Sequence, residues 1–254
     1  MSGAQPMPLL QARALTRRFG GLSAVNQASI DLHLGEVHAV IGTNGAGKST
    51  LINMLSGEIS VSDGVIILEG HDITHLSQPK RARCGIGRSY QRTTIFPTFS
   101  VLENCRLAAQ ASLQRPWMLW QSAVRCRDSL AIAQIALEKA GLGDSADLVA
   151  GSMSHGKKRQ LEIAMCLATS PKVLLLDEPL AGMGAEETER MLSLLEALKA
   201  THAVLLVEHD MDAVFRIADR ITVMVNGEVI ASNLPDAIRT NTRVLAAYLG
   251  DAPV

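Results

Sequence analysis

The chain has 254 residues, of which 47% are hydrophobic, and its formal net charge is −1. This length accommodates one large α/β domain or two small ones, and the near-neutral charge gives no electrostatic reason to expect nonspecific nucleic-acid binding. No apolar run approaches the roughly 18–20 residues that a membrane-spanning helix needs, and residues 1–8 lack the basic start and apolar core of a signal peptide.

Two runs near the N-terminus predict the first strands. Residues 8–34 alternate apolar and polar side chains in two runs, with Gly20-Gly21 and Leu22 between them. Such alternation around a glycine turn predicts an antiparallel strand pair. Phe19 lies at this turn, where it could belong to the core or stack on a flat ring such as adenine. The residues alone favour neither interpretation.

The next stretch fits the P-loop pattern, with glycine, lysine and a hydroxyl at the required spacing. Residues 37–41 predict a buried strand before it and residues 48–56 predict a helix after it. Glycines allow a tight turn whose N–H groups, together with the positive helix end, hold a phosphate chain. Lys48 is expected to reach the β- and γ-phosphates, and the Ser49 hydroxyl to bind Mg²⁺. The predicted cradle comprises Gly42, Thr43, Asn44, Gly45, Ala46, Gly47, Lys48, Ser49 and Thr50.

The segment after the P-loop helix predicts a hairpin, a helix and a strand. Residues 64–73 have the pattern of a short hairpin. The basic side chains of residues 79–84 predict a solvated helix face, formed by Lys80, Arg81 and Arg83. Residues 85–91 predict a strand that ends in Gln91. A glutamine there is usually structural, but beside a phosphate site it could bind Mg²⁺ or the attacking water.

Residues 100–141 predict a helical region. Ser100 followed by Glu103 forms a capping box at the start of a helix. Both tryptophans, Trp117 and Trp120, lie in this region. They could pack in a core or anchor a docking partner, because exposed aromatic residues are typical anchors of interfaces.

A second helix is predicted to begin after Ser154 and to extend to Leu167. Serine is a good N-cap, and it could also present its hydroxyl and the helix dipole to a phosphate. The three basic residues that follow are predicted to be solvated charges, namely Lys157, Lys158 and Arg159.

Two further apolar runs end in polar residues. Residues 173–176 are continuously apolar, as a parallel strand covered on both faces requires, and lead to Asp177 and Glu178. Because ligands of open α/β sheets lie beyond the carboxyl ends of the strands, these carboxylates should face the phosphates. Asp177 suits Mg²⁺ coordination and Glu178 suits a general base for water. Residues 203–207 repeat the pattern and lead to His209, a surface histidine or a γ-phosphate sensor.

Together these motifs resemble the ATP-binding subunits of ABC transporters over nearly the whole chain. The resemblance implies an α/β fold: a P-loop NTPase core with a mainly parallel sheet, an N-terminal antiparallel β subdomain and a helical signature subdomain. It implies one domain over residues 8–250, with a helical subdomain at about 92–167 and the core at about 8–91 and 168–250. The matching motifs are the adenine-stacking Phe19, Walker A at 42–50, the Q-loop Gln91, the signature 154–158, the Walker B pair Asp177 and Glu178, and the switch histidine His209.

The resemblance also implies the cofactors and the roles of these residues. ATP and Mg²⁺ are the expected cofactors. Catalysis is expected from Glu178, His209, Gln91 and Lys48, and Mg²⁺ contacts from Ser49, Gln91 and Asp177. The signature residues Ser154 and Gly156 would bind an ATP held by a second subunit. Four residues depart from the family pattern: Thr43, His155, Lys157 and Gly184.

Finer features are similar to importers of branched-chain amino acids and related amides, including urea. They lie in residues 18–22, 85–91, 161–164, 181–183 and 247–250. Membership would imply integral membrane subunits, a second ATPase subunit in a homodimer or heterodimer, and indirectly a periplasmic solute-binding protein, but no nucleic acid. The chain would lie peripherally at the cytoplasmic face of the inner membrane.

Two other classes of function remain as alternatives. Soluble ABC ATPases of DNA repair carry very long coiled coils between the Q-loop and the signature, whereas residues 92–153 hold only a compact insert. Those of translation carry two cassettes in one chain. A plain P-loop kinase or GTPase is disfavoured by Ser154 and His209, and no guanine-reading Asn-Lys-x-Asp motif is present.

Overall fold

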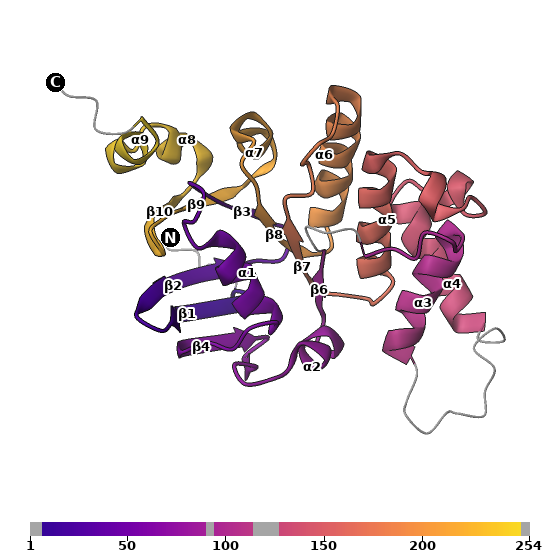
Figure 1. Cartoon of the computed structure of the whole chain (residues 1–254), viewed down its shortest axis with the longest axis horizontal. Coiled ribbons are helices and arrows are strands. Elements are labelled where there is room, and N and C mark those ends of the chain that lie inside the picture. Colours follow the sequence, from indigo (N-terminus) through magenta and orange to yellow (C-terminus); the bar gives the residue numbers. More distant parts are fainter. Residues whose placement is uncertain (1–6, 90–93, 114–126, 250–254) are drawn as a thin grey trace, which may run out of the picture.

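The computed structural model describes residues 7–89, 94–113 and 127–249, which form two sheets surrounded by helices (Figure 1). The strands are β1 (Leu10–Phe19), β2 (Leu22–Leu32), β3 (Val37–Gly42), β4 (Asp63–Leu68), β5 (His71–Asp72), β6 (Ile86–Arg88), β7 (Val173–Asp177), β8 (Ala203–Val207), β9 (Arg220–Val225) and β10 (Glu228–Asn233). The α-helices are α1 (Lys48–Ser56), α2 (Gln78–Arg83), α3 (Val101–Leu113), α4 (Arg127–Lys139), α5 (His155–Leu167), α6 (Ala185–Lys199), α7 (Met211–Ile217), α8 (Pro235–Arg239) and α9 (Thr242–Leu249). Short 3-10 turns occupy Gly143–Ser145 and Ala150–Ser152.

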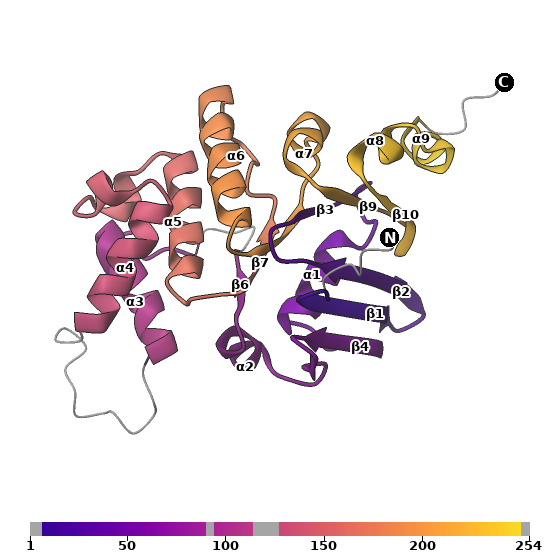
Figure 2. The same cartoon turned by 180° about the vertical axis from the view of Figure 1, so that it is seen from behind.

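The larger sheet has the strand order β10-β9-β3-β8-β7-β6, and only β10 runs antiparallel to its neighbour. All residues of β7 and β8 are buried, because helices α6 and α7 cover one face and α1 with the second sheet covers the other (Figures 1 and 2). The predicted α/β fold with a mainly parallel sheet is confirmed. The carboxyl ends of β3, β7 and β8 meet at one edge, where the polar motifs begin.

The smaller sheet is antiparallel, with the order β2-β1-β4-β5. The predicted N-terminal strand pair and the β4–β5 hairpin are therefore confirmed. The β9–β10 hairpin turns at Asn226 and Gly227, whose φ angles of 48° and 83° are those of a type I′ turn.

Helices α3, α4 and α5 pack together at one end of the molecule, beyond α6 (Figures 1 and 2). Their shared core contains Val101, Cys105, Leu137 and Leu161, each at most 1% exposed. The Ser100 hydroxyl accepts a hydrogen bond from the Glu103 N–H at 3.1 Å, which confirms the predicted cap. Trp117 and Trp120 lie outside the described residues. No helix in the described ranges combines the length and the apolarity needed to cross a bilayer.

Arg81 corrects the predicted solvated face of α2. Its side chain is 1% exposed and its guanidinium donates hydrogen bonds to carbonyl oxygens of four residues: Met54, Leu55, Thr74 and Leu76. Met54 and Leu55 belong to the last turn of α1, whose carbonyl groups have no partner within the helix. Arg81 thus ties the C-terminal end of the P-loop helix to α2 and to the loop before it.

Replacing Arg81 with Ala is expected to lower the free energy of unfolding by about 3 kcal/mol or more, because it leaves buried carbonyl groups without donors. Urea unfolding followed by circular dichroism measures this difference. Arg83→Ala, on the exposed side of the same helix, is the matched control and should change stability by less than about 0.5 kcal/mol. Equal stabilities of the two variants would contradict this account of Arg81.

Candidate functional site

The P-loop follows β3 and is held closely by neighbouring backbone. A Cβ at Gly42 would lie 2.2 Å from the Met224 carbonyl oxygen, and one at Gly47 would lie 2.5 Å from the Ala24 carbonyl oxygen. Gly47 also has a φ of 97°, which disfavours any side chain. These two positions therefore require glycine, as the spacing predicts.

Helix α1 begins at Lys48 with its positive end toward the loop. Gly47 provides no side-chain cap and the first turn contains no acidic residue, so the N-terminal N–H groups keep their capacity for an anion. Lys48 Nζ donates hydrogen bonds to the carbonyl oxygens of Gly42 at 2.7 Å and Thr43 at 3.1 Å. Burial lowers the pKa of Lys48, while the nearby Glu178 and Asp177 carboxylates raise it.

Asp177 ends β7 and is 4% exposed. Its Oδ1 is buried and has no hydrogen-bond partner in the described part of the chain. Arg88 Nη2 lies 3.9 Å from its Oδ2. Burial raises the pKa of Asp177, whereas Arg88 acts in the opposite direction. An orphaned buried carboxylate oxygen is a suitable ligand for a divalent cation.

Glu178 and His209 follow β7 and β8 and lie side by side. His209 Nδ1 is 3.9 Å from a carboxylate oxygen of Glu178, and the two side chains are 61% and 24% exposed, respectively. Glu178 has a φ of 50°. The left-handed conformation costs a non-glycine residue roughly 1–2 kcal/mol, so it persists only where surrounding contacts impose it.

The P-loop and Glu178 line a pocket of about 510 Å³. The predicted residues among its lining are Asn44, Gly45, Ala46, Gly47, Lys48, Ser49, Thr50 and Glu178. Two segments that were not predicted complete it: residues 22–24 of β2 and the Asn226-Gly227 turn. Phe19 does not line this pocket; it is 48% exposed, and the Arg17 guanidinium lies 4.7 Å from its ring centroid.

The signature helix, α5, begins away from this pocket. Ser154 caps it by accepting a hydrogen bond from the Lys157 N–H at 3.3 Å, as predicted. The Ser154 hydroxyl also donates to Glu187 Oε1 at 2.9 Å. A Cβ at Gly156 would lie 2.5 Å from the Glu187 carboxyl carbon. The Glu187 carboxylate, on α6, therefore lies directly over the N-terminus of the signature helix.

Residues 25–181, more than half of the chain, match the family model described as ABC transporter. The chain belongs to the ABC transporter family. The match spans the P-loop and the Asp177–Glu178 pair at the edge of the sheet, and the signature helix in the helical region.

Other members of the ABC transporter family are similar over their full length. The branched-chain amino acid transport ATP-binding protein BraF of Pseudomonas aeruginosa is 38% identical, with 96% of this chain and 99% of that protein covered. LivG of Escherichia coli, named likewise, is also 38% identical with the same coverage. A crystal structure of a nucleotide-free ATP-binding cassette from an ABC transporter superposes with a TM-score of 0.86 at 29% identity, covering 96% of this chain and all of that one. A cassette in its ADP conformation superposes with a TM-score of 0.84 at 28% identity, covering 97% of this chain and 100% of that one.

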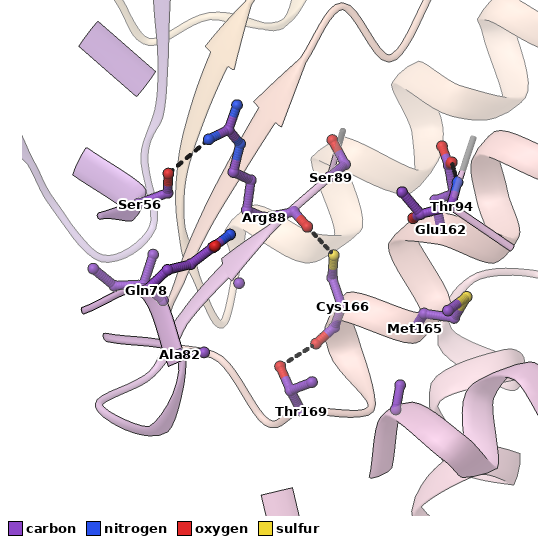
Figure 3. A pocket seen from close by; sticks show the side chains of 13 residues that line it. Ser56, Gln78, Ala82, Arg88, Ser89, Thr94, Glu162, Met165, Cys166 and Thr169 are labelled. Atoms are coloured by element: carbon purple, nitrogen blue, oxygen red, sulfur yellow. Dashed lines mark hydrogen bonds between the residues drawn. The ribbon is translucent and has the colours of Figure 1, made fainter. Parts of the chain in front are cut away.

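Within this ABC transporter fold, two further arginines were not recognised as buried or functional from the sequence. Arg159 is 7% exposed and pairs with Glu162 at 2.9 Å, so the predicted solvated charge is wrong at this position. Arg88, from β6, donates hydrogen bonds to Ser56 and Glu58, both at 2.6 Å. Figure 3 shows Arg88 beside a second pocket of about 230 Å³ between β6 and α5. Gln91, the predicted Q-loop residue, lies outside the described residues.

Proposed function

We propose that this protein is the ATP-hydrolysing subunit that powers an importer for branched-chain amino acids or related small amides. The observation that carries the proposal is the pocket in which the P-loop, with Lys48, faces Glu178 at the edge of the parallel sheet. The names of BraF and LivG support the class of solute, because both proteins match this chain over nearly their whole length.

Mg²⁺ fits the residues at this edge. Ser49 and Asp177 would hold the ion, and Gln91 would complete the set. The described residues contain no group of three or more His, Cys, Asp or Glu side chains that could bind a metal by themselves. Mg²⁺ does not need one, because it is usually bound through one or two carboxylates together with waters and phosphate oxygens. The ion would neutralise charge on the transferred phosphoryl group.

In hydrolysis, Glu178 accepts a proton from the attacking water, since its carboxylate borders the pocket where the γ-phosphate would lie. His209 and Lys48 hold the γ-phosphate. The α1 N-terminus and the loop N–H groups hold the remaining phosphates. All of these groups need only position the reactants and stabilise charge, which is how phosphoryl transfer is generally catalysed.

The working form is a head-to-tail dimer with ATP between the P-loop of one subunit and the signature helix of the other. The separation of Ser154 and Gly156 from the P-loop pocket within one chain supports this arrangement. The cassettes seen as dimers in solved structures are only 22% identical to this chain, so their likeness supports the fold alone. Closing on ATP and opening after hydrolysis would shift a membrane partner between two conformations.

The membrane subunits would dock on the helical region, at the cytoplasmic face of the membrane, and a periplasmic protein would deliver the solute. Phe96 and Phe99 are 49% and 43% exposed, and their stacked rings have centroids 5.6 Å apart. The adjacent Leu148 and Val149 are also about half exposed. These four residues form an exposed apolar patch. Such a patch suits a protein interface, because aromatic anchors dominate binding energy.

Substituting Phe96 and Phe99 with Ala, singly and together, is expected to weaken assembly with the membrane subunits by at least tenfold while leaving ATP affinity unchanged, since an aromatic anchor typically contributes about 2 kcal/mol or more. Co-purification from detergent-solubilised membranes measures assembly. Ile135→Ala, which removes another exposed apolar side chain on α4, is the control. Assembly at the parental level in the double variant would refute this docking surface.

The proposed function is tested by purifying the protein from membranes, identifying its integral partners, and measuring ATPase activity in vesicles with and without them. Stimulation by the partners, and further by a branched-chain amino acid with its binding protein, is expected. Activity indifferent to any membrane partner would favour a soluble ABC ATPase instead. The full-length similarity to transport proteins does not support that alternative.

A further inference from the structure

Glu208 is a carboxylate with no exposed surface, directly after β8. Burial raises its pKa. An ionisable side chain in such a place is unfavourable unless hydrogen bonds satisfy its oxygens. Glu208 is next to two residues of the proposed catalytic machinery. His209 follows it in the chain, and Glu178 follows the neighbouring strand β7 at the same edge of the sheet.

Each oxygen of the Glu208 carboxylate accepts a backbone hydrogen bond from a different loop. Oε1 accepts from the Leu180 N–H at 2.8 Å, in the turn that begins at Glu178. Oε2 accepts from the His209 N–H at 3.2 Å and lies 3.8 Å from His209 Nδ1. One buried side chain therefore links the loop after β7 to the loop after β8.

This link bears on the unfavourable backbone conformation of Glu178. Two backbone hydrogen bonds surround that residue: its N–H donates to the Val207 carbonyl at 2.9 Å, and its carbonyl accepts from the Ala181 N–H at 3.2 Å. The Leu180 N–H, between them, is the one whose acceptor is a side chain. Val207 and Glu208 are consecutive, so the end of β8 holds the turn that carries Glu178 from both backbone and side chain.

We propose that Glu208 is a positioning residue for ATP hydrolysis. Through the hydrogen bonds that its two carboxylate oxygens accept, it fixes the turn of Glu178 and the imidazole of His209 relative to each other. The inference rests on the proposed function, because it takes Glu178 as the base and His209 as a γ-phosphate contact. Glu208 does not line the nucleotide pocket. It acts on the rate of the chemical step and leaves ATP affinity to the P-loop.

Substitution can remove one or both of the hydrogen bonds that the Glu208 carboxylate accepts. Glu208→Gln keeps the volume but has a single carbonyl oxygen, which can accept from the Leu180 N–H or from the His209 N–H but not from both. Glu208→Ala removes both hydrogen bonds. The matched control is Asp219→Ala, because the Asp219 carboxylate also accepts a backbone N–H of the sheet, that of Val37 at 2.8 Å, but at the opposite end of β3.

The experiment measures kcat and KM for ATP in the complex purified with its membrane subunits, together with the melting temperature of each variant. We expect kcat to fall by about tenfold to a hundredfold in Glu208→Ala and by a smaller factor in Glu208→Gln, with KM within about twofold of the parent. Asp219→Ala should keep the parental kcat even where its melting temperature falls as much. In a Glu178→Gln background, Glu208→Ala should lower the residual rate by a smaller factor than in the parent, because part of its effect passes through the base.

The outcomes distinguish this inference from the proposed function. Parental kcat in Glu208→Gln and Glu208→Ala, beside an inactive Glu178→Gln, overturns the positioning role alone. Parental activity of Glu178→Gln overturns the proposed base whatever Glu208 does. Should Glu208→Ala fail to fold, Glu208→Gln decides: a lower kcat at unchanged KM supports the role, and a parental kcat, or a loss matched by Asp219→Ala, overturns it.

Discussion

Glu178→Gln is expected to lower ATP hydrolysis by about 10²–10⁴-fold while leaving ATP binding intact. Glutamine has nearly the same shape as glutamate but cannot accept the proton of the attacking water. The groups that bind the phosphates and Mg²⁺, among them Lys48, Ser49 and Asp177, are unchanged. ATP should therefore persist between the two subunits and hold them together.

Two measurements check this expectation. Steady-state phosphate release gives the rate, and size-exclusion chromatography with ATP and Mg²⁺ should show Glu178→Gln shifted toward a dimer, either alone or mixed with a second ATPase subunit. Normal activity would exclude Glu178 as the base. Lost hydrolysis without dimer accumulation would retain Glu178 as the base but argue against a dimer that holds ATP between its subunits. Gly184 and His155 would then be the first residues to restore to the family pattern.

Lys48→Ala should lower ATP affinity by roughly tenfold to a hundredfold without unfolding the protein. Its ammonium group lies over the loop carbonyls of Gly42 and Thr43, from where it can reach a phosphate chain in the pocket. A hydrogen bond from a charged donor contributes about 1.5–3 kcal/mol, which corresponds to this range of affinity.

Fluorescent nucleotide binding to the purified chain measures the change in affinity. Lys80→Ala, on the exposed side of α2, is the control for loss of one positive charge. The melting temperature without nucleotide should stay within a few degrees of the parental value, because the hydrogen bonds of the Lys48 ammonium group go to carbonyl oxygens of the P-loop itself. Parental ATP affinity in Lys48→Ala would place the nucleotide elsewhere.

The sequence predicted best those features whose chemistry depends on residues adjacent in the chain. A P-loop needs its glycines, lysine and serine at fixed spacing because one tight turn must meet one helix N-terminus. Asp177 and Glu178 were located because a strand buried on both faces has to be continuously apolar up to the point where it reaches the ligand edge.

Features that depend on distant segments were missed or mispredicted. Arg81 and Arg159 are charged residues in helices and were expected in solvent. Arg81 is buried because the carbonyl groups at the end of α1 lie beside it and accept from its guanidinium, which no local pattern reveals.

The lining of the nucleotide pocket shows the same limit. Asn-Gly is a typical sequence for a hairpin turn, but nothing in residues 226–227 indicates a place in the pocket. The turn reaches the P-loop because the Gly227 N–H donates to the Ala46 carbonyl at 3.1 Å, and its carbonyl accepts from the Asn26 N–H at 2.8 Å. This juxtaposition comes from the packing of both sheets, so the hairpin sequence alone could not place it.

The contact between Glu187 and Ser154 gives the signature helix an anion from its own chain. In the proposed dimer, a γ-phosphate can reach Ser154 only after this carboxylate rotates away from the space above Gly156. Joining the subunits then exchanges one anion for another and does not fill a bare site. The loss of the Glu187 contact therefore offsets part of the free energy that the signature helix gains from the phosphate, which weakens the hold of this contact on the joined subunits.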